Sequence, residues 1–95
     1  MAKPPAIAEY RITDHARQEM ARRQISEADV AQVLSAPEQS EPAREGREIF
    51  QSRIKIGEPP KTYLLRVFVD IEGKPPEVVT VYRTSKISKY WRTGP

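Results

Sequence analysis

The chain has 95 residues, a formal net charge of +3 and no cysteine. This length allows one small domain that buries roughly 60–65% of its unfolded surface, and the lack of cysteine excludes a disulfide framework and a thiolate metal site. No apolar run approaches the ~20 residues of a membrane span, and the N-terminus lacks the apolar core of a signal peptide. We therefore expect a cytoplasmic protein without a membrane partner.

Charge is distributed unevenly along the chain. Residues 1–48 contain seven Lys and Arg against nine Asp and Glu, a net charge of −2, whereas residues 49–95 contain nine against four, a net charge of +5. No acidic residue occurs from Val78 onward. A basic segment of this kind suits a polyanion such as RNA or DNA. It equally suits a solvated tail, or a surface that docks on an acidic protein.

The N-terminal half predicts two helices. The first is expected to run from the N-cap Thr13 to about Arg23. Its buried side is marked by apolar residues that recur every four positions, at Ile12, Ala16 and Met20.

A second helix is expected to begin at Ser26, which can form a capping box with Asp29. Pro37 ends this helix, because proline cannot continue the helical hydrogen-bond pattern. The apolar face of the helix consists of Val30, Val33 and Leu34. Residues 37–46 are polar and contain two prolines and a glycine, so they are predicted to form a loop.

The pattern then changes to period two and predicts three strands. Residues 49–56 alternate between apolar and polar side chains, and residues 62–71 are largely apolar on both faces, which is typical of a central strand. Residues 78–84 form the third strand, and short turns at 57–60 and 73–76 favour an antiparallel meander. The helices must cover one face of this sheet, since nothing else buries their apolar sides.

The predicted domain organisation has three parts. In chain order they are a flexible arm (1–9), one α+β domain (10–91) and a C-terminal tail (92–95).

His15 is the only histidine in the chain. It falls in the first turn of the first helix, in the stripe with Glu19 and Arg22 that lies beside the buried face. Histidine is the side chain whose unperturbed pKa lies in the neutral range, so His15 is the first candidate for proton transfer. The alternative is that His15 is only a local hydrogen-bond partner near the helix start.

Arg66 interrupts the most apolar strand, on the same face as Leu64 and Phe68. A planar guanidinium can hold a phosphate through two parallel hydrogen bonds. The alternative is a structural ion pair across the sheet, to Glu48 or Glu77. Both interpretations fit the sequence.

The third strand carries hydroxyl groups on one face, at Thr80, Tyr82 and Thr84, while Val79 and Val81 are expected to point into the core. Such a face can bind phosphate or ribose. It can also be an ordinary solvent-facing strand surface, since Thr and Tyr are favoured there.

Lys86 and Lys89 are three residues apart and share one side of a turn or short helix, with Tyr90 and Trp91 following. Aromatic rings beside lysines can stack on single-stranded bases while the lysines meet phosphates. For Trp91 we favour packing that caps the core, because aromatic residues dominate the core of a small domain.

The chain contains no Gly-rich phosphate loop, no second histidine for a zinc site and no dense carboxylate cluster for magnesium. We therefore expect no cofactor and no metal. Any catalysis is expected to be metal-independent.

Three segments resemble a small bacterial domain family of unknown function over about residues 10–91. They are ITDHARQEMARRQISEADVAQVL (12–34), RVFVD (66–70) and VVTVYRTSKISKYW (78–91). That family is similar to the ribonuclease fold of barnase, EndoU, colicin and RelE, which includes BrnT- and RelE-type toxins. The resemblance implies two N-terminal helices packed on a curved antiparallel sheet of three to four strands. It also implies a fold that can cleave RNA without metal.

In such nucleases the ribose 2′-hydroxyl attacks the adjacent phosphorus, which requires a base, an acid and cations around the phosphate. On this resemblance His15 is the base or acid and Arg66 the phosphate clamp. Tyr82 and Lys86 are further proton-transfer or charge-stabilising groups. The residues expected to help bind RNA are Arg22, Arg53, Arg83, Lys89 and Tyr90.

The ribonuclease hypothesis requires His15, Arg66 and either Tyr82 or Lys86 to converge on one cleft, because proton transfer needs hydrogen-bond reach. A toxin of this kind would have a protein antitoxin as partner. The alternative is a non-catalytic module of the same fold that binds RNA or a protein. A homodimer paired through an exposed β edge is a third hypothesis.

Overall fold

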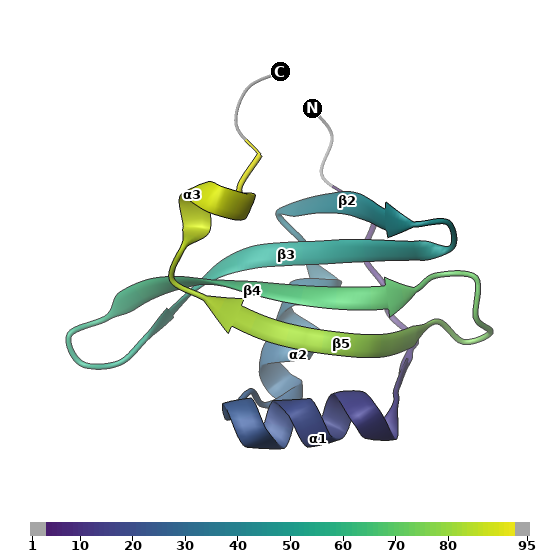
Figure 1. Ribbon diagram of the computed structural model, residues 1–95, viewed down its shortest axis with the longest axis horizontal. Coiled ribbons are helices and arrows are strands. Elements are labelled where there is room, and N and C mark those ends of the chain that lie inside the picture. Colours follow the sequence, from purple (N-terminus) through teal and green to yellow (C-terminus); the bar gives the residue numbers. More distant parts are fainter. Residues whose placement is uncertain (1–3, 93–95) are drawn as a thin grey trace.

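The structure is a computed structural model that describes residues 4–92. Figure 1 looks onto a sheet with α2 behind its strands and α1 running along β5. The elements in chain order are β1 (Arg11–Ile12), α1 (Asp14–Arg23), α2 (Glu27–Ser35), β2 (Gln39–Arg44), β3 (Arg47–Ile56), β4 (Lys61–Asp70), β5 (Glu77–Thr84) and α3 (Ile87–Tyr90).

The sheet has five strands in the order β1-β5-β4-β3-β2, so β4 is the central strand as predicted. The expected count of three to four antiparallel strands is wrong. β1 pairs with β5 in parallel, through Arg11 with Glu77 and Ile12 with Val78, and the sheet is therefore mixed. Two residues are too few to show a strand period, which is why the sequence pattern did not predict β1.

The predicted loop at 37–46 is the second correction, because residues 39–44 form strand β2. β2 pairs antiparallel with β3, with Ser40 opposite Phe50 and Pro42 opposite Glu48. It lies at the edge of the sheet and none of its residues is fully buried. An edge strand accepts polar residues and a proline, so its composition is that of a loop.

Both predicted helices are confirmed, together with their start signals. The Thr13 hydroxyl accepts from the backbone N–H of Ala16 at 3.1 Å, and Gln24 ends α1 in the left-handed region. The Ser26–Asp29 capping box is present at the start of α2. These local hydrogen bonds satisfy backbone groups that a helix end leaves without partners.

The hydrophobic core lies between the helices and one face of the sheet. α1 contacts β5, and α2 contacts β4 and β3. The strand alternation of β4 sends Leu65, Val67 and Val69 into this core. Leu64 and Arg66 are also buried, but on the opposite face, which we call the α3 face.

In β5 the structure corrects one residue of the predicted alternation. Phe68 is opposite Thr80, whereas its neighbour Val69 is opposite Val78, so Val79 is an extra residue in the ladder. Such a bulge shifts which side chains point inward. Val78 and Val81 therefore belong to the core, and Val79 is only half-buried.

The terminal segments were predicted to be an arm and a tail. Residues 1–3 and 93–95 lie outside the described residues. Within the described part, Ile7 packs against the core, and its N–H donates to the Leu34 carbonyl at 2.8 Å. At the other end, the Gln39 side chain binds both backbone groups of Arg92, at 2.6 Å to the carbonyl and 3.0 Å from the N–H.

Candidate nucleic-acid interface

Arg66 is the centre of a polar network on the α3 face. It is only 4% exposed, and each of its three side-chain nitrogens has a partner within the fold. Nε donates to Gln51 Oε1 at 3.0 Å, Nη2 to Glu41 Oε1 at 2.6 Å, and Nη1 to the Tyr82 hydroxyl. The ion-pair partner is Glu41 on β2, so the expected partners Glu48 and Glu77 are wrong. The guanidinium is thus already occupied by the fold.

Aromatic rings complete the surroundings of Arg66. Its Cζ lies 4.2 Å from the ring centroid of Tyr90, 5.5 Å from that of Tyr82 and 5.7 Å from that of Phe68. Burial raises the pKa of the Tyr82 phenol, whereas a hydrogen bond with Tyr82 lowers the pKa of Tyr90. Gln51 also donates to the Tyr90 carbonyl at 3.2 Å. These interactions hold α3 against the sheet.

His15 lies elsewhere. It belongs to α1, whose buried residues pack on the face of the sheet opposite to the α3 face. Its side chain is 72% exposed, with Nε2 3.5 Å from Glu19 Oε2, and that same oxygen is 3.5 Å from Arg23 Nη1. The other oxygen, Glu19 Oε1, is buried and has no hydrogen-bond partner among residues 4–92.

The four predicted catalytic residues are therefore not brought together as a set. Arg66 and Tyr82 are in direct contact, and His15 is on the other side of the sheet from them. Lys86 is exposed at the residue before α3, and in the described chain its side chain forms no hydrogen bond or ion pair with Arg66 or Tyr82. His15, the first candidate for acid or base, therefore does not share a cleft with Arg66 and Tyr82.

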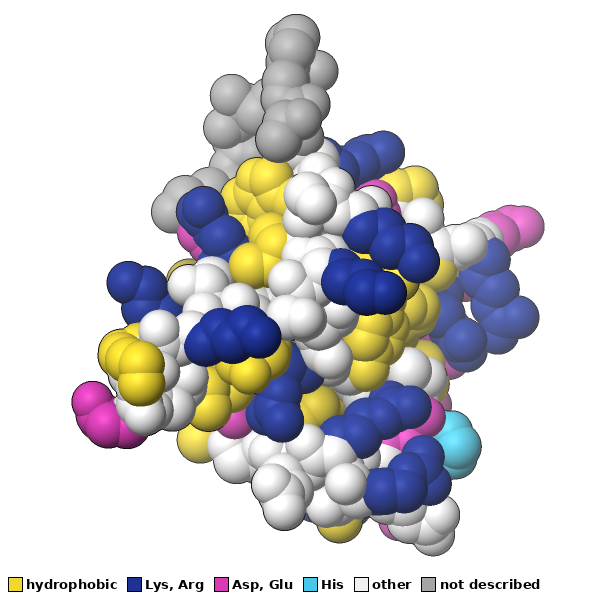
Figure 2. All heavy atoms as spheres, turned by 60° about the vertical axis from the view of Figure 1, so that its left-hand side comes forward, with side chains coloured by type: hydrophobic (Ala, Val, Ile, Leu, Met, Phe, Trp, Pro, Cys, Tyr) yellow, Lys and Arg dark blue, Asp and Glu magenta, His cyan; other side chains and the backbone are white. Residues whose placement is uncertain are grey.

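The structure gathers positive charge at one end of the sheet instead. Within residues 4–92, most Lys and Arg side chains without a carboxylate partner occur where the β3–β4 turn, the end of β5, α3 and the end of α1 meet. We call this end of the sheet, with both of its faces, the basic end, and its residues are Arg22, Lys55, Lys61, Arg83, Lys86 and Lys89. Arg83 joins the sheet to α1 by donating to the carbonyls of Arg23 and Gln24. Figure 2 shows this side of the molecule, with Lys and Arg side chains spread among apolar ones.

Aromatic rings lie beside these cations. The Tyr63 ring centroid is 5.5 Å from Lys61 Nζ and 5.6 Å from Arg83 Cζ. Lys89 Nζ lies 5.4 Å from the Tyr90 ring. Cation–aromatic proximity of this kind is common in surfaces that bind single-stranded nucleic acid.

Of the predicted RNA-binding residues, the basic end contains Arg22, Arg83 and Lys89. Lys55, Lys61 and Tyr63 were not singled out from the sequence. The sequence did contain a signal for the two lysines, because the predicted turn at 57–60 brings Lys55 and Lys61 to the same end of the sheet. Arg53 and Trp91 lie next to this end, with Arg53 Cζ 4.2 Å from the indole centroid.

The opposite end of the sheet is acidic. It holds the β2–β3 turn, the β4–β5 turn and the adjoining strand ends. Its acidic residues are Glu45, Glu48, Asp70, Glu72 and Glu77. Arg47 and Arg11 neutralise two of them, through ion pairs with Asp70 at 2.6 Å and Glu77 at 2.5 Å. Arg44 and Lys74 also lie at this end, so its net charge is only about −1, whereas the basic end is strongly positive.

The Arg47–Asp70 pair makes stability depend on pH. The hydrogen bond from Arg47 lowers the pKa of Asp70 below its value in the unfolded chain. Because a depressed carboxyl pKa stabilises the fold above the pKa of the unfolded chain, the pair contributes fully at neutral pH, and this contribution is lost in acid as pH falls through the lowered pKa of Asp70. We expect Asp70→Asn to be less stable than the wild type at pH 7 and to approach it in acid, in urea denaturation at both pH values. An equal gap at both pH values would contradict this assignment.

Residues 12–83 match the family described as a domain of unknown function (DUF4258), and the chain belongs to that family. None of the curated proteins compared with the chain matches it, and neither does any solved structure. In the described residues, no helix is long and apolar enough to cross a membrane, and no group of three or more His, Asp or Glu side chains is arranged to hold a metal ion.

Proposed function

We propose that this protein is a non-catalytic module that binds single-stranded RNA at the basic end. The observation that carries the proposal is that cations without carboxylate partners gather at one end of the sheet, beside aromatic rings. Lysines there suit the phosphates of the strand, and the rings suit unstacked bases. An acidic protein would also match the charges, but rings beside lysines are the pair of features that a single strand, with its bases and phosphates, uses together.

Two further observations favour binding over cleavage. Each side-chain nitrogen of Arg66 already donates to a group of the fold, and His15 lies on the other side of the sheet. The ribonuclease activity, the antitoxin partner and the kinship with RelE and barnase remain predictions from the resemblance. So does the homodimer.

The binding test uses two pairs of charge reversals that change the net charge equally. Lys55→Glu with Lys86→Glu alters the basic end, and Arg44→Glu with Lys74→Glu alters exposed cations at the acidic end. We expect the first pair to weaken binding of a labelled oligo(U) strand at least about tenfold at low salt. It should also make binding less dependent on salt, by about 0.7 in the logarithmic slope for each phosphate that the variant no longer neutralises. We expect the second pair to have little effect.

Equal weakening by both pairs would mean that only the net charge matters, and the proposed site would be wrong. Incubation of a mixed single-stranded RNA with the protein in EDTA tests the non-catalytic part of the proposal. Cleavage that leaves 2′,3′-cyclic phosphate ends, and that disappears in His15→Ala, would instead support the ribonuclease hypothesis.

A further inference from the structure

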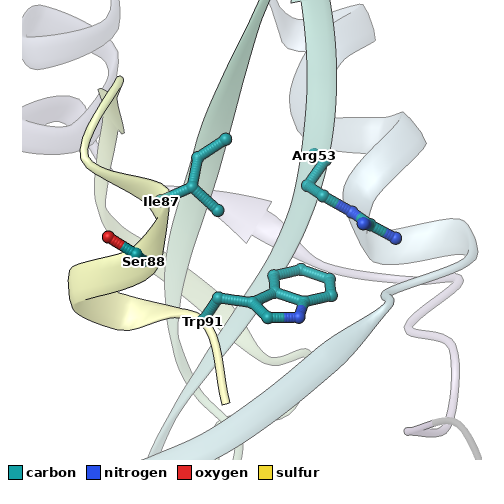
Figure 3. Close-up of a pocket in the computed structure, with 4 residues that line it drawn as sticks. All are labelled: Arg53, Ile87, Ser88 and Trp91. Carbon is teal, nitrogen blue, oxygen red and sulfur yellow. The ribbon is translucent and has the colours of Figure 1, made fainter. Parts of the chain in front are cut away.

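A hollow of about 410 Å³ lies between α3 and β3 on the α3 face. Arg53, Ile87, Ser88 and Trp91 line it. Figure 3 shows Ile87 and Trp91 extending from the α3 segment toward the strand that carries Arg53. The volume lies within the range of small-ligand sites, which is roughly 300–1,000 Å³.

Trp91 is held in place by its surroundings. Its backbone N–H donates to the Ile87 carbonyl at 2.8 Å, and the next residue, Arg92, is bound by Gln39. Arg53 stacks its guanidinium near the indole ring and is itself fixed by Glu38, at 2.9 Å from Nη2 to Oε2. A ring that is ordered before binding loses little conformational entropy when a ligand stacks on it.

The chemistry around the hollow selects among occupants. Its walls combine an aromatic ring, an aliphatic side chain and a guanidinium. Lys86 and Lys89, which have no carboxylate partner in the described chain, flank it on α3. Lys55 lies on the same face of β3 as Arg53. A planar ring with a negative group on either side fits this arrangement, and a nucleotide within a single strand has that form.

We infer that this hollow is the subsite for one unstacked nucleobase of the bound strand, an inference that rests on the proposed RNA binding. Trp91 supplies the stacking surface and Ile87 the aliphatic wall. Lys55, Lys86 and Lys89 hold the phosphates on either side. Trp91 was predicted to cap the core, but this residue is only half-buried and lies outside the core cluster.

The test exploits the fact that Trp91 is the only tryptophan in the chain, so all indole emission reports on this hollow. The full chain is titrated with oligo(U) and with an abasic strand of the same length, while a label on each strand reports binding independently. We expect oligo(U) to quench Trp91 emission in proportion to binding, and the abasic strand to bind more weakly without quenching.

Substitutions supply the second measurement. We expect Trp91→Leu to weaken oligo(U) binding about 5- to 150-fold, the range for the loss of one base–aromatic stack. Trp91→Phe should retain most of the affinity because it keeps an aromatic face. Urea denaturation of both variants checks that the sheet is intact.

The outcomes separate the inference from the function on which it rests. Oligo(U) binding without quenching, or with unchanged affinity in Trp91→Leu, would overturn the base subsite and leave RNA binding standing. Equal quenching by polyglutamate would assign the hollow to an acidic protein partner and overturn the inference. Absence of any RNA binding at low salt would remove both proposals.

Discussion

Replacing Arg66 with methionine is expected to lower the free energy of unfolding by about 3–5 kcal/mol, the range for removing one partner of a buried ion pair. The substitution leaves Gln51 Oε1, Glu41 Oε1 and the Tyr82 hydroxyl without the donor that each has now. A buried polar group that loses its hydrogen-bond partner destabilises the fold by its full desolvation penalty. Urea denaturation at pH 7, followed by circular dichroism, measures the change.

Two further variants identify the source of this loss. Arg66→Lys keeps the charge but not the planar set of donors, so we expect it to recover only part of the stability. In Arg66→Met, Glu41 keeps only its ion pair with the exposed Arg92, at 3.3 Å. Glu41→Gln combined with Arg66→Met removes this carboxylate charge, and we expect the double variant to be more stable than Arg66→Met alone. Wild-type stability in Arg66→Met would show that the network is energetically neutral and that Arg66 is free for another role.

Replacing Leu65 with alanine is expected to cost about 2–5 kcal/mol of unfolding free energy. Leu65 has no exposed surface and lies on the central strand, in the core shared with both helices. The loss combines the transfer of the side chain from water with the cavity left behind. Because small domains are stable by only about 5–15 kcal/mol in total, this variant should have a much lower urea midpoint.

The control is Ile71→Ala, directly after the same strand. Ile71 is 43% exposed, so we expect its loss to change the unfolding free energy by less than about 0.5 kcal/mol. A similar cost for both substitutions would contradict the assignment of the core to the face that carries Leu65.

The fold was predictable where local patterns and burial agree. The Ser26 cap, the two helices and the central strand at 61–70 all carry strong local signals. β2 was missed because an edge strand needs no apolar face, and β1 because two residues show no period. The bulge at Val79 depends on pairing with β4, which no local pattern reports.

The candidate site was predictable in its charges and less so in its geometry. The excess of positive charge after Val78 pointed to Lys86 and Lys89. The partner of Arg66 could not be found without β2, because Glu41 lies on that strand. His15 and Arg66 are separated because the helices cover the face of the sheet from which the side chain of Arg66 points away. A shift of β4 by one residue would turn Arg66 toward the helices, and local sequence patterns do not fix that register.

The uneven charge of the two ends of the sheet gives the protein an electric dipole along its strands. The electric field of a polyanion such as RNA rotates a dipolar protein before contact, so that the basic end faces the RNA when the two molecules meet. This orientation acts on the encounter and not on the bound state. Added salt should therefore slow the association of RNA much more than it speeds its dissociation.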